Sequence, residues 1–279
     1  MANTVLITGC SSGFGKATAH EFARNGWNVV ATMRDPAAGT EFSEVPNVLV
    51  TRLDVQDQSS IDGAIAAGID HFGGIDVVVN NAGFAINSIF ETIPKAKVQE
   101  IFEVNTFGVM DVIRAILPHF RAKHAGTIVN VSSGVGVFGL PLASLYNASK
   151  FAVEGFSESL SYELSSIGVT IKLVEPGAAP STGFPARSGS ETARLDVPEE
   201  YRDFIDAALG VYKGFRTGAD ENVIDKVAKG IFAAATDGSD RLRYVLTEDI
   251  KPMIKARRET SEDEYVAYMR GVFPYGRQK

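Results

Sequence analysis

The sequence predicts an α/β fold with a doubly wound parallel sheet and helices on both faces. Short runs rich in valine and isoleucine alternate along the chain with longer amphipathic stretches. This alternation favours a parallel sheet joined by right-handed crossover helices. The apolar runs are continuous, which is typical of strands that are covered on both faces. No repeat, charge block or low-complexity linker interrupts the 279 residues, so we expect a single domain over 1–279.

The predicted elements follow one another from the first residues to the last quarter of the chain. Seven segments are expected to be strands: Thr4–Thr8, Trp27–Met33, Val48–Leu53, Ile75–Asn80, Gly126–Ser132, Val169–Val174 and Leu242–Leu246. Six segments are expected to be helices: Gly15–Asn25, Ser59–Phe72, Lys95–Phe120, Leu145–Ser166, Pro198–Phe215 and Asp220–Ala235.

The composition changes after Pro176, where the stretch Gly177–Arg194 is rich in glycine, alanine, proline and serine and is expected to be a loop. From Thr247 the chain mixes charges with aromatic side chains, which favours a solvated helix with one docking face. A tail that covers the substrate or contacts another subunit is the alternative. We therefore expect residues 1–182 to form the core and residues 183–279 to form a lid, the last strand and a helical tail.

Composition excludes several classes of function. The 27 Lys and Arg residues against 34 Asp and Glu residues give a formal charge of −7, which argues against a broad nucleic-acid surface. No apolar run approaches the roughly 20 residues of a membrane span, and no secretion signal opens the chain, so we expect a cytoplasmic protein without a membrane partner. The four histidines, at 20, 71, 119 and 124, lack metal-ligand spacing, and we expect no metal.

The segment Thr8–Gly15 leaves the first predicted strand and enters the first helix. Its G-x-x-x-G-x-G spacing supplies glycines that turn tightly and admit a phosphate, while the helix N-terminus offers unpaired N–H groups. This arrangement favours a bound nucleotide over a plain strand–helix connection. Cys10 is expected to fit there as a small side chain, with a reactive thiol as the alternative. The expected contacts are Gly9, Ser11, Ser12, Gly13, Phe14 and Gly15.

The end of the second strand is expected to contact the adenosine ribose. An acidic residue there prefers NAD, but this chain has Met33 followed by Arg34, whose guanidinium suits a 2′-phosphate. We therefore expect NADP(H) to be preferred over NAD(H), with an Arg34 that only pairs with Asp35 as the alternative. After the third strand, Asp54 and Val55 are expected near the adenine, although Asp54 could instead cap the next helix.

Tyr146 and Lys150 lie four residues apart on a predicted helix and therefore share one face. A phenol has a pKa near 10, and a neighbouring ammonium favours the phenolate, so we expect Lys150 to lower the pKa of Tyr146. Ser133 ends the preceding strand, and its hydroxyl is placed to bond the same substrate oxygen. Together with the nucleotide turn, these residues favour acid–base chemistry on a carbonyl or alcohol.

Five motifs now stand in one order: Thr8–Gly15, Asp54, Asn80-Asn81-Ala82-Gly83, Ser133 with Tyr146 and Lys150, and Pro176-Gly177. In this order and spacing the chain resembles the short-chain dehydrogenase/reductase family, which has a Rossmann-type fold. The stretch Tyr146–Phe156 is most similar to hydroxysteroid- and retinol-dehydrogenase-like members. The resemblance is strong over residues 3–182 and loose beyond them.

The resemblance implies a role for each matching residue. Tyr146 would be the general acid in reduction and the base in oxidation, Lys150 would assist it and bind the nicotinamide ribose, and Ser133 would polarise the carbonyl. Asn105 would hold a water that links Lys150 to solvent, unless it only kinks its helix by bonding the backbone. The remaining expected cofactor contacts are Asn81, Ala82, Gly83, Pro176, Gly177, and Ser181 or Thr182, since the family's threonine position falls on Ser181.

The predicted function is thus NADP(H)-dependent interconversion of a carbonyl and an alcohol. The expected substrate is bulky and apolar, because these residues suggest an apolar pocket: Phe84, Val135, Phe138, Leu140, Leu142 and Phe184. A homodimer or homotetramer is expected by family analogy, through helices near Phe102–Phe120 and Phe151–Ser166. A non-catalytic nucleotide-binding regulator is the main alternative, and an epimerase or dehydratase of the extended relatives is a weaker one.

Overall fold

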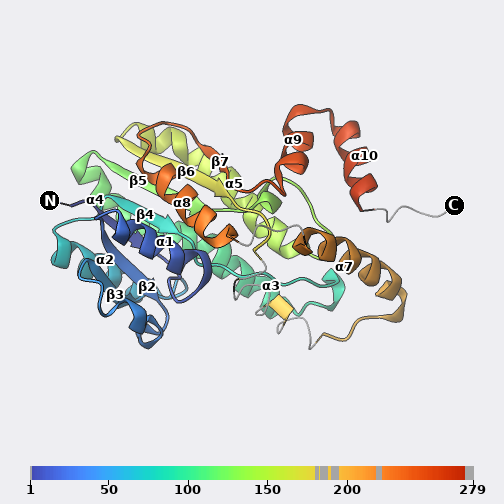
Figure 1. Ribbon diagram of the computed structural model, residues 1–279, viewed down its shortest axis with the longest axis horizontal. Coiled ribbons are helices and arrows are strands. Elements are labelled where there is room, and N and C mark those ends of the chain that lie inside the picture. Colours follow the sequence, from blue (N-terminus) through green and yellow to red (C-terminus); the bar gives the residue numbers. More distant parts are fainter. Residues whose placement is uncertain (1, 180–181, 183–187, 190–194, 218–221, 274–279) are drawn as a thin grey trace.

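The computed structural model describes residues 2–179, 182, 188–189, 195–217 and 222–273. Within them, the strands form one parallel sheet in the order β3-β2-β1-β4-β5-β6-β7 (Figure 1). The strands are β1 (Thr4–Ile7), β2 (Asn28–Met33), β3 (Val48–Arg52), β4 (Val77–Asn80), β5 (Gly126–Val131), β6 (Val169–Glu175) and β7 (Arg243–Val245). The order reverses between β1 and β4, which confirms the predicted doubly wound parallel sheet.

Helices cover both faces of this sheet (Figure 1). One face packs against α1 (Gly13–Arg24) and α8 (Val223–Thr236), and the other against α2 (Gln58–Phe72), α4 (Gly108–Lys123) and α5 (Ser144–Ser165). Successive strand residues serve opposite layers: Leu6 joins the core under α2, α4 and α5, while Ile7 joins the core under α1 and α8. Both are fully buried, which explains why the strands have continuous apolar sequences.

The N-terminus of α2 settles one open assignment. Its N-cap is Asp57, whose carboxylate accepts a hydrogen bond from the Ser60 N–H. Asp54 instead accepts from the Gln56 N–H at 3.1 Å, within the loop that precedes the helix. The alternative in which Asp54 caps the helix is therefore wrong.

The single helix predicted over Lys95–Phe120 is divided. It consists of α3 (Lys95–Phe102), a π-helical turn over Glu103–Phe107, and α4. The turn places the Asn105 side chain against the chain at Phe84, where it bonds both backbone groups of that residue. A π-turn inserts one extra residue into a helix and frequently marks a functional position.

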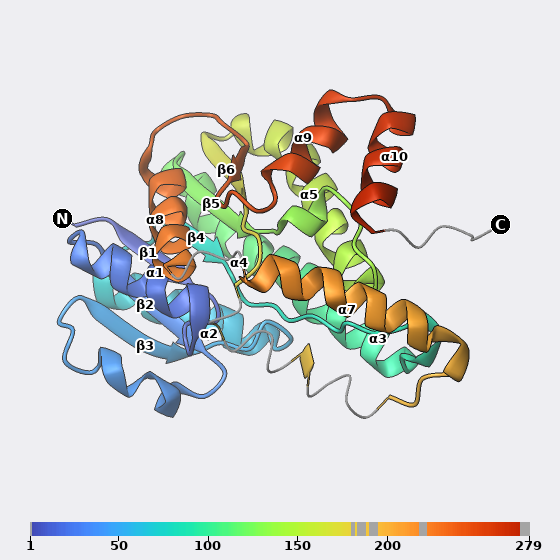
Figure 2. The same ribbon diagram turned by 45° about the vertical axis from the view of Figure 1, so that its right-hand side comes forward.

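The C-terminal part forms α7 (Arg202–Thr217), α9 (Lys251–Glu259) and α10 (Glu262–Val272), which all lie at the same end of the molecule (Figure 1, Figure 2). The tail is thus two helices, and a capping box between Ser261 and Glu264 starts the second one. Among the helices of the described residues, none is long and apolar enough to cross a membrane. Most of the predicted loop over 177–194 lies outside the described residues.

Candidate active site

The glycine turn lies at the carboxyl end of β1, beside the point where the strand order reverses. Gly9 and Gly13 have φ angles of +75° and +58°, which favour glycine. A Cβ built on Gly15 would lie 2.3 Å from the Gly9 carbonyl oxygen and 2.4 Å from Asn81 Nδ2, so no larger residue fits there.

The N-terminus of α1 is open to an anion. Among the described residues, Ser12 at the N-cap makes no side-chain bond to the first turn, and that turn contains no acidic residue. The cap and first-turn side chains therefore neither accept hydrogen bonds from the first N–H groups of the helix nor balance its partial positive charge. This end of α1, with the glycine turn before it, fits the pyrophosphate of a dinucleotide.

The segment Asn81-Ala82-Gly83 joins this turn to the chemical residues. The Thr8 hydroxyl accepts hydrogen bonds from the N–H groups of Asn81 and Ala82, each at 3.0 Å. Asn81 Nδ2 donates to the Thr8 carbonyl oxygen at 2.9 Å. A Cβ built on Gly83 would lie 3.1 Å from Asn105 Oδ1 and 3.7 Å from Lys150 Nζ. The three predicted contacts therefore lie between the phosphate turn and the lysine.

The side chain of Arg34 is exposed at the end of β2 and, among the described residues, has no ion-pair partner. Asp35 accepts instead from the Ala37 N–H at 3.0 Å. The ion pair between Arg34 and Asp35 that the sequence left open is therefore not seen among the described residues. Met33 is buried at 2% exposure. Val55 is also buried, against Gly108, so it can offer only its backbone to an adenine ring.

Ser133 and Tyr146 are neighbours at the carboxyl edge of the sheet, where the Ser133 hydroxyl is close enough to lower the pKa of the Tyr146 phenol. Ser133 begins a short 3-10 turn after β5, and its Oγ lies 3.4 Å from both the Pro176 carbonyl oxygen and the Val135 nitrogen. Asn147 Nδ2 donates to the Val135 and Phe138 carbonyl oxygens at 3.1 and 2.7 Å. The helix that carries Tyr146 therefore also holds the loop that carries Ser133.

Lys150 is buried at 4% exposure, one turn after Tyr146 on α5. Its Nζ donates to the Val131 carbonyl oxygen at 2.8 Å and lies 5.9 Å from the centre of the Tyr146 ring. The predicted neighbourhood of Ser133, Tyr146 and Lys150 is therefore present in the structure.

The pKa values differ from the expectation for this pair. Burial raises the pKa of Tyr146 to about 12, and the neighbouring Ser133 hydroxyl opposes this only in part. Burial lowers the pKa of Lys150 to about 8, against the carboxylate of Glu154. Lys150 is not among the causes of this shift, so the expected lowering of the Tyr146 pKa by lysine is wrong for this structure. The phenol is protonated at neutral pH, which is the state that can give a proton to a carbonyl oxygen.

Asn105 is fully buried, and its polar atoms are bonded within the chain. Oδ1 accepts from the Phe84 N–H at 3.0 Å, while Nδ2 donates to the Phe84 carbonyl oxygen at 2.8 Å and to Ser149 Oγ at 3.0 Å. The helix-kinking alternative is therefore observed. Its Oδ1 also faces the space next to Gly83 and Lys150, so the water-holding role stays a prediction.

The turn after β6 is held by residues that the sequence reasoning missed. The Gly177 N–H donates to Thr247 Oγ1, and the Ala178 N–H donates to Asp249 Oδ2, each at 2.9 Å. These partners lie 70 and 71 residues further along the chain, so no local signal announces them. The Pro176 carbonyl oxygen accepts from the Gly134 N–H at 3.0 Å, which joins this turn to the Ser133 loop.

Two further candidates follow Pro176-Gly177 in the sequence. Ser181 lies outside the described residues. Thr182 donates to the Ala179 carbonyl oxygen at 2.8 Å, and its Cβ lies 3.5 Å from a Cβ built on Gly13. Thr182 thus lies next to the glycine turn, Thr8–Gly15.

The residues predicted to form the substrate pocket have unequal exposure. Phe84 and Phe138 are at most 1% exposed, so they support the pocket from behind rather than lining it. Val135 is also buried, Leu140 and Leu142 are partly buried, and Phe184 lies outside the described residues. The tail adds to this region, because Tyr146, Tyr265 and Met269 pack on one apolar cluster: Val135, Phe138, Ile250, Met253 and Ile254.

The structure also describes the surroundings of Cys10 and the arrangement of possible metal ligands. Cys10 is fully buried, and burial raises the pKa of its thiol to about 12, so a reactive thiolate at this position is excluded. Within the described ranges, no group of three or more histidine, cysteine or acidic side chains could hold a metal ion.

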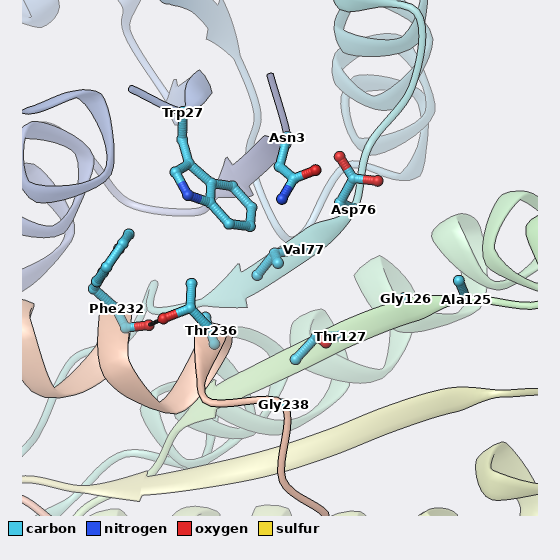
Figure 3. Close-up of a pocket in the computed structure, with 11 residues that line it drawn as sticks. Asn3, Trp27, Asp76, Val77, Ala125, Gly126, Thr127, Phe232, Thr236 and Gly238 are labelled. Atoms are coloured by element: carbon cyan, nitrogen blue, oxygen red, sulfur yellow. Dashed lines mark hydrogen bonds between the residues drawn. The ribbon is translucent and has the colours of Figure 1, made fainter. Parts of the chain in front are cut away.

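A cavity of about 470 Å³ lies far from these residues, at the amino edge of the sheet (Figure 3). Trp27 and Phe232 form apolar walls, and Asp76 stands at the start of β4. The Asp76 carboxylate already accepts from the Thr4 N–H at 2.8 Å and from Lys123 Nζ at 2.7 Å. A second hollow, of about 390 Å³, lies beside Ser12, Gly13 and Thr182 at the phosphate turn.

A parallel sheet with a phosphate-binding turn at its reversal point, and a Ser–Tyr–Lys group beside it, defines an NAD(P)-dependent dehydrogenase or reductase. The sequence model described as short chain dehydrogenase matches residues 3–191, and the chain belongs to this family. An uncharacterised oxidoreductase of Schizosaccharomyces pombe is 37% identical over 84% of this chain and 97% of its own length. Retinol dehydrogenase 8 of Bos taurus is 40% identical over 62% of this chain and 58% of its own length.

Solved structures agree with this assignment. A short-chain dehydrogenase of Streptomyces avermitilis superposes with a TM-score of 0.81 at 27% identity and covers 99% of both chains. A Burkholderia phymatum family member in complex with NAD has a TM-score of 0.78 at 27% identity, over 92% of this chain and 93% of its own. ElxO with NADP bound has a TM-score of 0.71 at 26% identity, over 88% and 97%. Both cofactors thus occur among similar structures.

Proposed function

We propose that the protein interconverts a ketone or aldehyde and an alcohol with NADP(H), with Tyr146 as the general acid and base. The observation that carries the proposal is the grouping of three residues at the carboxyl edge: Ser133 beside Tyr146, and buried Lys150 one turn further on, with its Nζ 5.9 Å from the centre of the Tyr146 ring. Two hydroxyls that converge at the carboxyl edge can bind one substrate oxygen between them. The whole chain is proposed to be one domain, since its strands share one sheet.

In reduction, the nicotinamide supplies a hydride to the carbonyl carbon. Tyr146 gives its phenolic proton to the carbonyl oxygen, and Ser133 donates a hydrogen bond to the same oxygen, so an alcohol is formed. The Lys150 ammonium stabilises the phenolate that remains, because an opposite charge nearby favours the ionised form. Asn105 fixes the π-turn behind Lys150 and is proposed to hold a water that returns the proton. Oxidation follows the same steps in reverse.

The preference for NADP(H) over NAD(H) is supported by Arg34. It is exposed at the end of β2 without an ion-pair partner among the described residues, and Met33 stands where an acid would favour a free ribose hydroxyl. A guanidinium can bind a 2′-phosphate through paired hydrogen bonds. Asp54, Val55 and the segment Asn81–Gly83 are proposed as further contacts of the cofactor.

A bulky apolar carbonyl compound or secondary alcohol is the proposed substrate. The apolar cluster beside Tyr146, to which the tail contributes Tyr265 and Met269, supports this class. The similarity to retinol dehydrogenase 8, which is named for a long apolar alcohol, points the same way. Leu140 and Leu142 are proposed to line the pocket, with Val135 at its base.

Self-association and location complete the proposal. A homodimer or homotetramer is supported by two exposed aromatic side chains, Phe151 on α5 at 42% and Phe107 at 47%. Sedimentation of the wild type against a Phe151→Glu variant tests this face, and a monomeric wild type would contradict it. A cytoplasmic location is proposed from the acidic composition and the single cysteine.

The decisive experiment replaces Tyr146 by phenylalanine. Tyr146→Phe is expected to lose turnover with a panel of ketones and aldehydes, followed by NADPH absorbance, while NADPH binding followed by fluorescence is retained. Tyr162→Phe is the matched control, because this tyrosine is 76% exposed on the same helix. Full turnover by Tyr146→Phe would overturn the mechanism. A wild type that binds NADPH but reduces no compound of the panel would favour the regulatory alternative.

A further inference from the structure

A cluster of buried charges lies directly behind Lys150. Glu154 follows Lys150 by one turn on α5 and is 6% exposed, while Glu175 at the end of β6 is 0% exposed. Two arginines from the C-terminal part face them, Arg243 of β7 and Arg258 of α9. Burying carboxylates costs several kcal/mol each unless they are paired, so such a cluster is weak evidence for a purely stabilising role.

The distances show which arginine pairs with which glutamate. Arg243 Nε lies 2.9 Å from Glu154 Oε2 and 3.8 Å from Glu175 Oε1, and its Nη2 binds Glu158. Arg258 Nη2 lies 2.5 Å from Glu175 Oε1. The arginines come from β7 and α9. The carboxylate of Glu154 therefore lies between Arg243 and α5, the helix that carries Tyr146 and Lys150.

Glu154 shares a helix face with Lys150. Residues four apart on a helix have Cβ atoms roughly 5–6 Å apart, and both side chains here are buried. Gly136 packs against this part of α5, since a Cβ built there would lie 2.9 Å from Glu154 Cγ and 3.3 Å from the backbone carbonyl oxygen of Lys150. The carboxylate raises the pKa of Lys150 against the effect of burial. Burial and Glu175 raise the pKa of Glu154 itself, and Arg243 opposes them by favouring the charged carboxylate. In low-dielectric surroundings such a charge acts more strongly than in water.

We propose that Glu154 is a positioning residue whose buried carboxylate keeps Lys150 charged and sets the pH at which the Lys150–Tyr146 pair releases its proton. This inference rests on the proposed function, because it takes Lys150 and Tyr146 as the working pair. Arg243 holds the Glu154 carboxylate, and Arg258 holds Glu175. β7 and α9 thereby keep the carboxylates of Glu154 and Glu175 charged beside α5, the helix that carries Tyr146 and Lys150.

The direction of the effect follows from electrostatics. The charged groups that face Glu154 are Lys150 and Glu158 on its own helix, Glu175 on β6, Arg243 on β7 and Arg258 on α9, with the Ser132 hydroxyl as a polar neighbour. Glu154→Gln removes one negative charge from this group. Loss of a proton from the Lys150–Tyr146 pair then becomes easier, whichever member releases it, and the apparent pKa falls by about one unit.

The test reads the lysine directly. In ¹⁵N-lysine-labelled protein, the Lys150 ε-amino signal, identified by its loss in Lys150→Arg, is followed against pH by NMR. Glu154→Gln is expected to lower the Lys150 pKa by about one unit, a tenfold change in proton concentration at the midpoint. Glu154→Asp is expected to restore most of it. Glu158→Gln is the matched control, because Glu158 binds the same arginine from a 51% exposed position and should leave the pKa unchanged.

Activity supplies the second measurement. The acid limb of the pH profile of kcat for alcohol oxidation should move to lower pH by the same amount in Glu154→Gln and should not move in Glu158→Gln. An unchanged Lys150 pKa with only a lower Tm would overturn the proposal. If Glu154→Gln does not fold, Glu154→Met, which removes the same charge and keeps an unbranched side chain, is measured with the same two outcomes: a fall of the Lys150 pKa supports the proposal and no fall contradicts it. The NMR titration needs no turnover, so its outcome is independent of the Tyr146→Phe result.

Discussion

The two edges of the sheet use polar groups in opposite ways. At the amino edge lies the larger of the two cavities described above, of about 470 Å³, yet the carboxylate of Asp76 there already bonds Thr4 and Lys123 (Figure 3). At the carboxyl edge, the first turn of α1 lacks a side-chain cap among the described residues, and the Ser133 and Tyr146 hydroxyls converge. The residues proposed to act on the substrate therefore lie at the reversal of strand order and not at this cavity.

The largest loss of activity is expected when a hydroxyl is removed from the carboxyl edge. Ser133→Ala removes the hydroxyl next to Tyr146 that is proposed to donate to the substrate oxygen. Removal of one such donor lowers kcat by about 10²–10³-fold. Ser165→Ala is the control, because that exposed hydroxyl on α5 bonds only the Tyr162 carbonyl oxygen. Steady-state kinetics with NADPH measures both variants, and a fall of less than about fivefold in Ser133→Ala would show that the hydroxyl is dispensable.

The next effect concerns the phosphate turn. A Cβ at Gly15 would lie 2.3 Å from the Gly9 carbonyl oxygen, so Gly15→Ala must displace backbone and should weaken NADPH binding by at least about tenfold, or 1.4 kcal/mol. Gly63→Ala on α2 is the control, since no described atom outside its own helix lies within 4 Å of that Cβ. It should stabilise the protein by up to about 1 kcal/mol. Fluorescence titration and thermal unfolding measure the two, and equal NADPH affinity in both variants would contradict the role of the turn.

The carboxyl edge could be predicted from the sequence because its parts are local. Continuous apolar strands predicted a sheet covered on both faces, and Thr8–Gly15, Ser133 and Tyr146 each follow or begin an element. The break at Asn105 could not be predicted in the same way. Its helix has unbroken apolar periodicity, and the π-turn is fixed by bonds to Phe84, 21 residues earlier in the chain.

The same distinction explains the pKa values and the contacts after β6. The expected effect of Lys150 on Tyr146 followed from helix spacing alone, but burial of the phenol depends on the tail packing around it. Thr247 and Asp249 bind the Gly177–Ala178 backbone across 70 and 71 residues of sequence. Side-chain partners that come from distant segments leave no periodic signal, so only the fold reveals them.

A smaller effect at the carboxyl edge concerns the preference for NADPH over NADH. Arg34→Ala should raise KM for NADPH about tenfold or more and leave KM for NADH nearly unchanged, because a charge-assisted hydrogen bond to phosphate contributes about 1.5–3 kcal/mol. Arg114→Ala, at a 73% exposed arginine on α4, is the control. Kinetics with both cofactors decides the point. A wild type with the lower KM for NADH, or an Arg34→Ala variant with unaltered KM for NADPH, would contradict the proposed preference.

The smallest effect is expected at the amino edge, and it tests whether that cavity takes part in function. Asp76→Ala removes the acceptor of the Thr4 N–H and the partner of Lys123, whose side chain is 34% exposed. Loss of one backbone hydrogen bond and a partly exposed ion pair should cost about 1–2 kcal/mol of stability, measured by urea unfolding. kcat and KM should stay within about twofold of the wild type, because the carboxylate acts only on the start of β1 and on α4. A large change in KM with unchanged stability would instead mean that ligands use this edge, and the contrast between the two edges would no longer hold.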